Sequence, residues 1–126
     1  MNKTVAAIIV KENEILLEKR AIEPFKGLWV LPGGHANKDE DVEKAVIREV
    51  HEETGLEFFN INFVKQFPEQ FPEIKWQGIV YVFVGDAKGD LKMDKESSEL
   101  RFIHLEEIDQ LEMGFDHKKI IKEVLL

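Results

Sequence analysis

Residues 34–56 (GHANKDEDVEKAVIREVHEETGL) combine the apolar spacing of an amphipathic helix with glutamates that an ordinary surface helix would place elsewhere. At ~100° per residue, Glu49 and Glu53 project within ~40° of each other, and Glu52 lies ~60° to the other side of Glu49. The apolar residues in the same half of the helix are Val42, Ala45, Val46 and Val50. A soluble helix normally sets its charges opposite its apolar stripe. Since crowded carboxylates repel one another and resist burial, this pattern predicts a neutralising cation.

The carboxylates favour a hard divalent cation, because Mg²⁺ prefers oxygen ligands. We therefore expect Glu49, Glu52 and Glu53 to hold Mg²⁺, with Mn²⁺ as a substitute. Arg48 lies four residues before Glu52, a spacing at which helical ion pairs form. Glu40 stands at the expected start of the helix, where a carboxylate gains from the helix dipole. Both side chains thus have a structural alternative to a role in the site.

Glycines and an aspartate mark the ends of this helix. Gly33 and Gly34 precede it and allow a backbone turn that a Cβ atom would block. We expect the two glycines to place the helix and to offer an amide to a substrate phosphate. Asp39 is the expected cap at the start of the helix, and Gly55 fits the position just past its end.

The same segment resembles the signature of the Nudix hydrolase family. In that signature G, five residues, E and seven residues precede R-E-U-x-E-E-x-G-U, where U is an aliphatic residue. Every specified position is matched, by Gly34, Glu40, Arg48, Glu49, Val50, Glu52, Glu53, Gly55 and Leu56. The preceding residues 28–34 (LWVLPGG) resemble the strand and turn that lead into the signature.

The resemblance implies an α/β fold, the Nudix fold, in which an α/β/α sandwich is built around a mixed β-sheet. It implies Mg²⁺-dependent hydrolysis of a diphosphate linkage, in a nucleoside diphosphate joined to a further moiety X. In the family, the glutamates that match Glu49, Glu52 and Glu53 hold the metal, and the arginine that matches Arg48 orients them. Metal ions favour this reaction because they neutralise phosphate charge and lower the pKa of water.

A general base for the attacking water comes, in that family, from the signature or from a glutamate in a later loop. Glu96 and Glu99 lie in the corresponding loop, and Glu96 is the first candidate by its position. Lys19 and Arg20, at the end of the second expected strand, are candidates to contact substrate phosphates. The alternative for each of these residues is a solvated surface charge.

Length and composition limit the remaining possibilities. The 126 residues suit one domain, residues 1–126. No apolar run approaches the ~20 residues of a membrane span, so we expect no membrane partner. Cysteine is absent, which is compatible with a reducing compartment, and we expect a cytoplasmic protein. The net charge of −8 repels nucleic-acid phosphates, so we expect a small-molecule nucleotide substrate and no duplex nucleic acid.

The hydrophobic pattern predicts strands before and after the helix of residues 40–54, and a second helix at 115–126. The expected strands are residues 4–10, 15–19, 28–31, 58–67, 76–84 and 101–105. The expected loops are residues 21–26, 68–73 and 85–98, where proline, glycine or polar residues gather. This order predicts an α/β arrangement with a mixed sheet.

Histidines and aromatic residues give weaker signals. The histidines have no close pair at metal-ligand spacing, so we expect structural or solvent-facing roles for His35, His51, His104 and His117. A base-stacking ring is expected among aromatic residues that otherwise belong to the core. These residues are Trp29, Phe67, Phe71, Trp76 and Phe83.

Three functions fit the signature. The first is a nucleoside triphosphate pyrophosphohydrolase similar to MutT-like proteins, favoured because the chain is short. The second is an ADP-ribose or nucleotide-sugar hydrolase, since Pro72 falls 16 residues after the signature, where some ADP-ribose-cleaving members have a proline. The third is a nucleotide-binding module without turnover, disfavoured because every signature glutamate is present. The sequence does not encode the base, X, the number of metal ions or the oligomeric state, although many relatives are homodimers.

Overall fold

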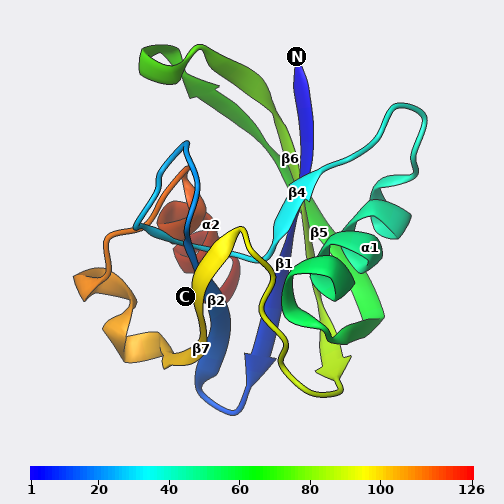
Figure 1. Cartoon of the computed structure of the whole chain (residues 1–126), viewed down its shortest axis with the longest axis vertical. Coiled ribbons are helices and arrows are strands. Elements are labelled where there is room, and N and C mark those ends of the chain that lie inside the picture. The colour runs from blue at the N-terminus through cyan, green and yellow to red at the C-terminus, as the bar shows by residue number, and fades with distance from the viewer.

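The computed structural model describes residues 1–126 and shows a mixed seven-stranded sheet with two flanking helices (Figure 1). The strands are β1 (Asn2–Lys11), β2 (Glu14–Arg20), β3 (Trp29–Val30), β4 (Gly33–His35), β5 (Glu57–Phe71), β6 (Trp76–Lys88) and β7 (Ser97–His104). The helices are α1 (Val42–Thr54) and α2 (His117–Leu125), and the 3-10 turns are η1 (Pro72–Ile74) and η2 (Leu105–Gln110).

The sheet is organised around the neighbouring strands β1 and β6. The strand order is β3-β2-β1-β6-β5, while β4 also pairs with β1 and β7 also pairs with β2. Strands β1 and β6 run parallel, with Val5 opposite Tyr81, and the other pairs are antiparallel. The predicted mixed sheet is therefore confirmed.

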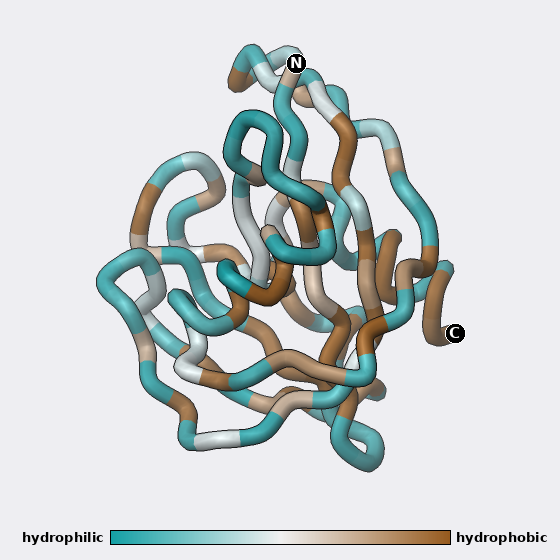
Figure 2. Tube along the Cα trace, turned by 90° about the vertical axis from the view of Figure 1, so that its right-hand side faces the viewer, coloured by the Kyte–Doolittle hydropathy of each residue, from teal (hydrophilic) through white to brown (hydrophobic).

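Alternate residues of β1 enter two separate hydrophobic layers. Ala6 and Ile8 belong to one layer, whereas Val5, Ala7 and Ile9 belong to the other. Successive side chains of a strand point to opposite faces of its sheet. A strand covered on both faces accordingly has a continuous apolar sequence, as the run AAIIV shows. In Figure 2 the brown, hydrophobic segments gather in the interior and the teal, hydrophilic segments lie mainly in the peripheral turns.

Each helix covers one of these layers. Helix α1 buries Ala45, Val46 and Val50 against the face that holds Val5, and α2 buries Ile120 and Ile121 against the opposite face. This arrangement is the α/β/α sandwich that the resemblance to the Nudix signature implied. Neither helix combines the length and apolar character needed to cross a membrane.

Several elements agree with the sequence-based predictions. The first two expected strands form the antiparallel pair β1–β2, in which Val10 lies opposite Ile15. Strand β6 lies inside the sheet between β1 and β5, and the C-terminal helix is α2. The three-residue strand β4 was not expected, because its two glycines read as a turn.

The loop expected at residues 68–73 is wrong for its first four residues. Strand β5 continues through Pro68 to Phe71, and only Pro72–Ile74 leave the strand. Proline has no N–H to donate to a ladder, but β5 is an edge strand, where that loss is tolerated. The longer β5 places Glu69 on a strand.

The loop expected at residues 85–98 is also shorter than predicted. Strand β6 continues past Gly85 to Lys88, and β7 begins at Ser97 instead of Arg101. A Cβ at Gly85 would lie 2.8 Å from the ring of Phe58. The glycine thus permits close packing between neighbouring strands and does not end the strand.

The ends of α1 agree with the prediction at one terminus only. Gly55 follows the helix with φ 78°, a left-handed conformation that favours glycine. The expected N-cap, Asp39, lies outside the helix with φ 66°, and Asp41 occupies the cap position without a side-chain hydrogen bond. Glu40 also precedes the helix, so its contribution to the first turn was predicted wrongly.

Candidate active site

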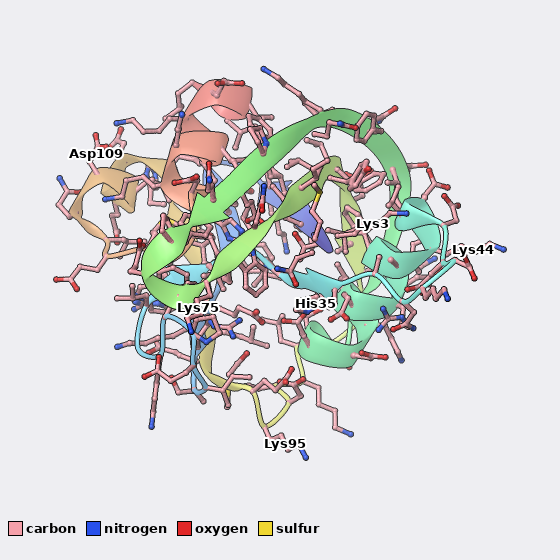
Figure 3. All side chains as sticks on the ribbon, turned by 90° about the horizontal axis from the view of Figure 1, so that it is seen from above. Lys3, His35, Lys44, Lys75, Lys95 and Asp109 are labelled. Carbon is pink, nitrogen blue, oxygen red and sulfur yellow. The ribbon has the colours of Figure 1, made fainter.

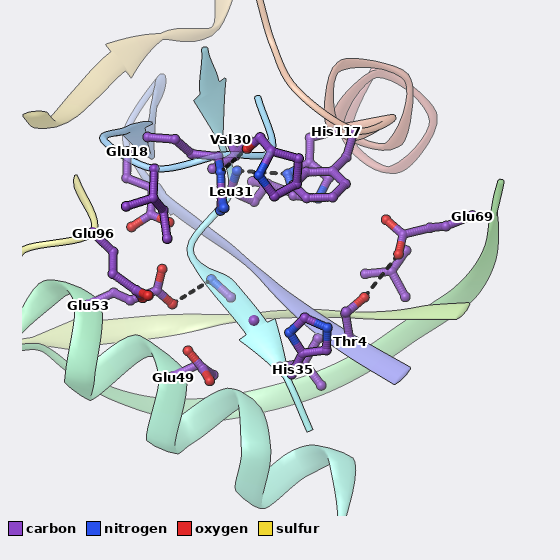
Figure 4. A pocket seen from close by; sticks show the side chains of 18 of the residues that line it. Thr4, Glu18, Val30, Leu31, His35, Glu49, Glu53, Glu69, Glu96 and His117 are labelled. Atoms are coloured by element: carbon purple, nitrogen blue, oxygen red, sulfur yellow. Dashed lines mark hydrogen bonds between the residues drawn. The ribbon is translucent and has the colours of Figure 1, made fainter. Parts of the chain in front are cut away.

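One pocket of about 400 Å³ lies between the sheet, α1 and the loops that precede β7 and α2. Its volume is within the range of small-molecule sites. We call one side of it the acidic end (Glu18, Glu49, Glu53 and Glu96) and the other the aromatic end (His35, Trp76, Phe115 and His117). In Figure 4 the carboxylates of the acidic end face one another, while Glu69 and Thr4 lie across the pocket.

Glu53 is one of two deeply buried members of the acidic end. It is 4% exposed, and its Oε2 accepts a hydrogen bond of 3.1 Å from the backbone N–H of Gly33. Burial, together with the neighbouring carboxyl groups of Glu18 and Glu49, raises the pKa of Glu53 well above its usual value. The amide that we expected to face phosphate therefore faces a glutamate, because Gly33 donates to Glu53.

Glu18 joins this group from β2 and was missed by the sequence analysis. It is 3% exposed, accepts a hydrogen bond of 3.0 Å from Ser97 Oγ, and has its pKa raised by burial. A signal was present, because Glu18 lies two residues from Leu16 and thus on the same face of the strand. A glutamate on a buried strand face needs a partner, which here is the site itself.

Arg48 connects the acidic end to the segment before α1. Its guanidinium contacts Glu40 at 2.9 Å, Glu49 at 3.0 Å and Glu52 at 3.2 Å, and donates to the backbone oxygen of His35 at 3.0 Å. Hydrogen bonds from Arg48 hold the pKa of Glu40 at about 2, and those contacts raise the pKa of Arg48 further. Arg48 is therefore placed to fix the orientation of three signature glutamates, Glu40, Glu49 and Glu52.

The three glutamates expected to hold the metal do not all enter the pocket. Glu49 and Glu53 line it, and the side chain of Glu49 is 14% exposed. The side chain of Glu52 is 52% exposed and contacts Arg48 outside the pocket. In this conformation no three carboxylate or imidazole side chains are close enough to hold a metal ion by themselves. Burial nevertheless raises the pKa of Glu49 too, so the acidic end gathers hard oxygen donors that require protons or a cation.

These donors fit Mg²⁺ or Mn²⁺ in their chemistry. Mg²⁺ usually keeps several waters and takes one or two carboxylates together with substrate phosphates, so a complete cage of protein ligands is not required. Glu49 and Glu53 present two carboxylates to the pocket, and the exposed Glu52 carboxylate contacts Arg48 outside it.

Gly34 is needed where β4 meets α1. A Cβ at Gly34 would lie 2.6 Å from the carboxylate oxygen of Glu49, and one at Gly33 would lie 2.0 Å from the backbone oxygen of Val5. Both glycines therefore allow the strand to approach its neighbours closely. The prediction that they place the helix agrees with this geometry.

The two candidate bases lie in different surroundings. Glu96 is exposed on the turn before β7 and lines the pocket, where Figure 4 shows its carboxylate beside Glu53. The backbone N–H of Ala21 donates to the backbone oxygen of Glu96 at 2.8 Å and anchors this turn. Glu99 lies within β7, 3.4 Å from Arg101, and does not line the pocket. The geometry thus favours Glu96.

Arg20 is the one lysine or arginine side chain that lines the pocket. Its Nε donates to the backbone oxygen of Pro24 at 2.6 Å, and its guanidinium lies 5.6 Å from the ring centre of Phe115. Seen from above in Figure 3, Lys44 extends outward from α1 and Lys95 extends outward from the turn before β7. Arg20 is therefore the residue placed to contact an anionic group between the two ends of the pocket.

The aromatic end presents several rings in mutual contact. The ring of Trp76 lies 5.3 Å from that of His35 and 5.5 Å from that of Phe115, which stacks 5.3 Å from His117. His117 is buried, and its Nδ1 accepts a hydrogen bond of 3.0 Å from the N–H of Leu31. Of the aromatic residues proposed from the sequence for base stacking, only Trp76 lines the pocket.

Several known proteins are similar to this chain in sequence or in fold. The NUDIX domain profile matches residues 1–124. An ADP-ribose pyrophosphatase from Methanocaldococcus jannaschii is 41% identical over 124 residues, which cover 96% of this chain and 71% of that protein. A MutT NUDIX hydrolase from Burkholderia pseudomallei has the same fold, with a TM-score of 0.87 and 26% identity. The match covers 99% of this chain and 98% of that protein.

A third similar protein is a bifunctional NMN adenylyltransferase/ADP ribose pyrophosphatase from Francisella tularensis, whose structure was solved with AMP and a manganese ion. The TM-score is 0.81 and the identity 26%, over 98% of this chain and 41% of that protein. The similarity thus spans nearly all of this chain.

Proposed function

Because this chain belongs to the NUDIX domain family and is a Nudix hydrolase, we propose that its single domain, residues 1–126, hydrolyses the diphosphate linkage of ADP-ribose or a related nucleotide sugar. The observation that carries this proposal is the pocket, which joins buried carboxylates at one end to aromatic rings at the other. A nucleoside diphosphate joined to a sugar has the matching parts, since its charged centre needs a cation and its base needs a flat apolar surface.

The order of the two substrate hypotheses changes from the one drawn from sequence. The 41% identity to an ADP-ribose pyrophosphatase supports the nucleotide-sugar substrate, which was the alternative. The triphosphate substrate stays as the second candidate, because the MutT protein from B. pseudomallei matches over 98% of its own length.

We assign the metal to Glu49, Glu53 and Glu52, which would hold Mg²⁺ or Mn²⁺ beside the substrate diphosphate. When bound, the cation neutralises phosphate charge and makes a water molecule more acidic. Arg48 keeps Glu49 and Glu52 in place through its hydrogen bonds. Glu18 raises the pKa of the neighbouring Glu53 carboxyl, and Glu40 orients Arg48 by accepting its hydrogen bond.

In the proposed reaction, water attacks one phosphorus atom and the bridging P–O bond breaks. Glu96 accepts the proton of the water, and its position on an exposed turn leaves it free to approach once substrate is bound. Arg20 contacts the phosphate oxygens. ADP-ribose would yield AMP and ribose 5-phosphate.

Product analysis on a matched set of substrates tests this proposal. The purified chain is incubated with Mg²⁺ and ADP-ribose, nucleotide sugars or nucleoside triphosphates, and the products are separated by ion-exchange chromatography. We expect AMP and ribose 5-phosphate as products, and a higher kcat/KM for ADP-ribose than for any triphosphate. Release of pyrophosphate from a triphosphate at a higher kcat/KM would instead favour the MutT-like function.

A further inference from the structure

Glu69 is a buried carboxylate at the aromatic end that the proposed chemistry does not use. It is 3% exposed, comes from β5 and lines the pocket, opposite the acidic end in Figure 4. Its distance from the signature in sequence and its position behind Pro68 concealed it from the sequence analysis. A carboxylate is seldom buried without several hydrogen-bond donors, so its partners show what it can still bind.

The two oxygens of Glu69 have different surroundings. Oε1 accepts hydrogen bonds from Thr4 Oγ1 at 3.1 Å and from Trp76 Nε1 at 3.3 Å. No protein group donates to Oε2. Since an ionised carboxylate can accept about four hydrogen bonds, Glu69 has capacity for a donor that arrives with a ligand.

The indole of Trp76 connects this carboxylate to a flat surface. Trp76 is half-buried, and its ring contacts those of His35 and Phe115 while its N–H holds Glu69. A nucleobase stacked at such a surface presents its edge groups in the plane of the ring. An in-plane amino group is the donor that an unpaired carboxylate oxygen accepts best.

We propose that Glu69 selects the base of the substrate, its free oxygen Oε2 accepting a hydrogen bond from the exocyclic amino group of adenine, cytosine or guanine. This inference rests on the proposed nucleotide substrate and adds the class of base to it. A base with a carbonyl oxygen at the same place is disfavoured, because two acceptors then face each other without a proton between them. Burial raises the pKa of Glu69, and the hydrogen bonds from Trp76 and Thr4 offset part of that rise.

The variant Glu69→Gln separates this role from a structural one. The Trp76 indole N–H can only donate, so it keeps the oxygen of the glutamine amide on its own side. The amide NH₂ then takes the place of Oε2 and turns an acceptor into a donor. The hydrogen bond from Trp76 is kept, so the fold is preserved while the preference for the base is reversed.

Binding of AMP and IMP, which differ at position 6 of the purine, is the direct test. We expect titration calorimetry to show AMP binding to the wild type roughly 10- to 100-fold tighter than IMP, the range of one hydrogen bond to a charged group. Glu69→Met, whose thioether sulfur is only a weak acceptor, should largely remove the preference, and Glu69→Gln should favour IMP. Glu73→Gln, at an exposed position on η1, is the matched control and should bind like the wild type.

Unchanged AMP-to-IMP ratios in both Glu69 variants would overturn the inference, as would failure of the wild type to bind either nucleotide at millimolar concentration. The same variants are assayed for hydrolysis of ADP-ribose and its inosine analogue. If both variants turn over at the wild-type rate, and the ratio of ADP-ribose to inosine-analogue hydrolysis is the same in all three proteins, base selection by Glu69 is rejected. The proposed reaction then still stands. Absence of turnover together with selective AMP binding rejects the reaction and leaves base selection intact.

Discussion

The acidic end and the aromatic end of the pocket differ in the charge of their buried polar groups. At the acidic end, Glu18, Glu49 and Glu53 are crowded together, and burial raises the pKa of each. At the aromatic end, His117 is held in the neutral form and accepts the N–H of Leu31, so its polar ring is buried with a partner. The acidic end is incomplete until a cation arrives, whereas the buried imidazole of the aromatic end already has its hydrogen-bond partner in the protein.

This difference indicates where stability and activity conflict. Mutual repulsion of buried carboxylates lowers the stability of the free protein, and the same carboxylates provide metal affinity. Contacts at the aromatic end stabilise the fold and the binding surface together. Substitutions at the acidic end should therefore move stability and activity in opposite directions, and those at the aromatic end should move them in the same direction.

Glu53→Gln should produce the largest change. Loss of a charged metal ligand should lower kcat by roughly 10³-fold, equivalent to about 4 kcal/mol. Without metal the melting temperature should rise at pH 7–8. The pKa of Glu53 is higher in the folded protein than its ordinary 4.5, so wild-type stability falls as the pH rises from 4.5 through the folded pKa. A glutamine has no such ionisation and still accepts the Gly33 N–H.

Glu52→Gln is the control that separates the loss of kcat from the rise in metal-free melting temperature. Its side chain is 52% exposed, so its substitution should impair catalysis if Glu52 binds metal, without raising the metal-free melting temperature. Kinetics with varied Mg²⁺ and melts monitored by circular dichroism measure both quantities. Wild-type kcat in both variants at saturating Mg²⁺ would disprove the assignment of the metal ligands.

Glu96→Gln should have the next largest effect. If Glu96 accepts the proton of water, kcat should fall by roughly 10²-fold while the dependence on Mg²⁺ concentration stays that of the wild type. Glu99→Gln, in β7 and outside the pocket, is the matched control and should retain kcat within a few-fold. Equal activity of the two variants would mean that Glu96 is not the general base. Glu49 or Glu52 of the signature would then be the next candidate for that role.

The pocket residues also differ in how well the sequence predicted them, according to whether they lie on the helix or on strands. Glu49, Glu53 and Arg48 were found because one helix fixes their spacing, and helical geometry relates neighbouring residues directly. Glu18 and Glu69 reach the pocket on separate strands, and only strand pairing brings them near the helix. No local pattern carries that information, so the sequence could not show which strand residues meet.

Predictions of the fold succeeded and failed for related reasons. The β1–β2 hairpin and the buried strand β6 follow from hydrophobic patterns within one segment. The extension of β5 through Pro68 depends on the strand being at an edge, which is a property of the assembled sheet. Likewise Asp39 has the right chemistry for a cap, but the chain turns at that residue with φ 66° and the helix begins later.

His117→Asn tests the aromatic end through pH. Burial, and then the charge of Arg20, lower the pKa of His117 to about 3 from its usual 6.5. The unfolded chain therefore binds the proton more readily, and wild-type stability should be complete above pH 6.5 and fall by up to about 1.4 kcal/mol per pH unit below it. Asparagine retains an acceptor for the Leu31 N–H without the titration.

The measurement for His117 is urea unfolding of both proteins between pH 8 and pH 5. The difference in unfolding free energy should shift in favour of His117→Asn as the pH falls, and the carboxylates of the acidic end cancel because both proteins contain them. A difference that is constant over this range would show that the imidazole is not held neutral by the fold.

Addition of Mg²⁺ should have the smallest effect, a rise in melting temperature that depends on the residues of the acidic end. At ten times its dissociation constant, a ligand that binds only the folded state stabilises it by about 1.4 kcal/mol, which corresponds to a rise of roughly 3–6 °C in melting temperature. The rise should be lost in Glu53→Gln and retained in His117→Asn, since the first variant removes a ligand and the second lies at the other end. An unchanged wild-type melt in millimolar Mg²⁺ would contradict a site formed by the protein alone.

Because Mg²⁺ often takes part of its coordination from substrate phosphates, the melt is repeated with a non-hydrolysable ADP-ribose analogue. A rise that requires both Mg²⁺ and the analogue would show that the acidic end completes its metal site only with substrate, and the same wild-type rise in Glu53→Gln would show that the metal binds elsewhere.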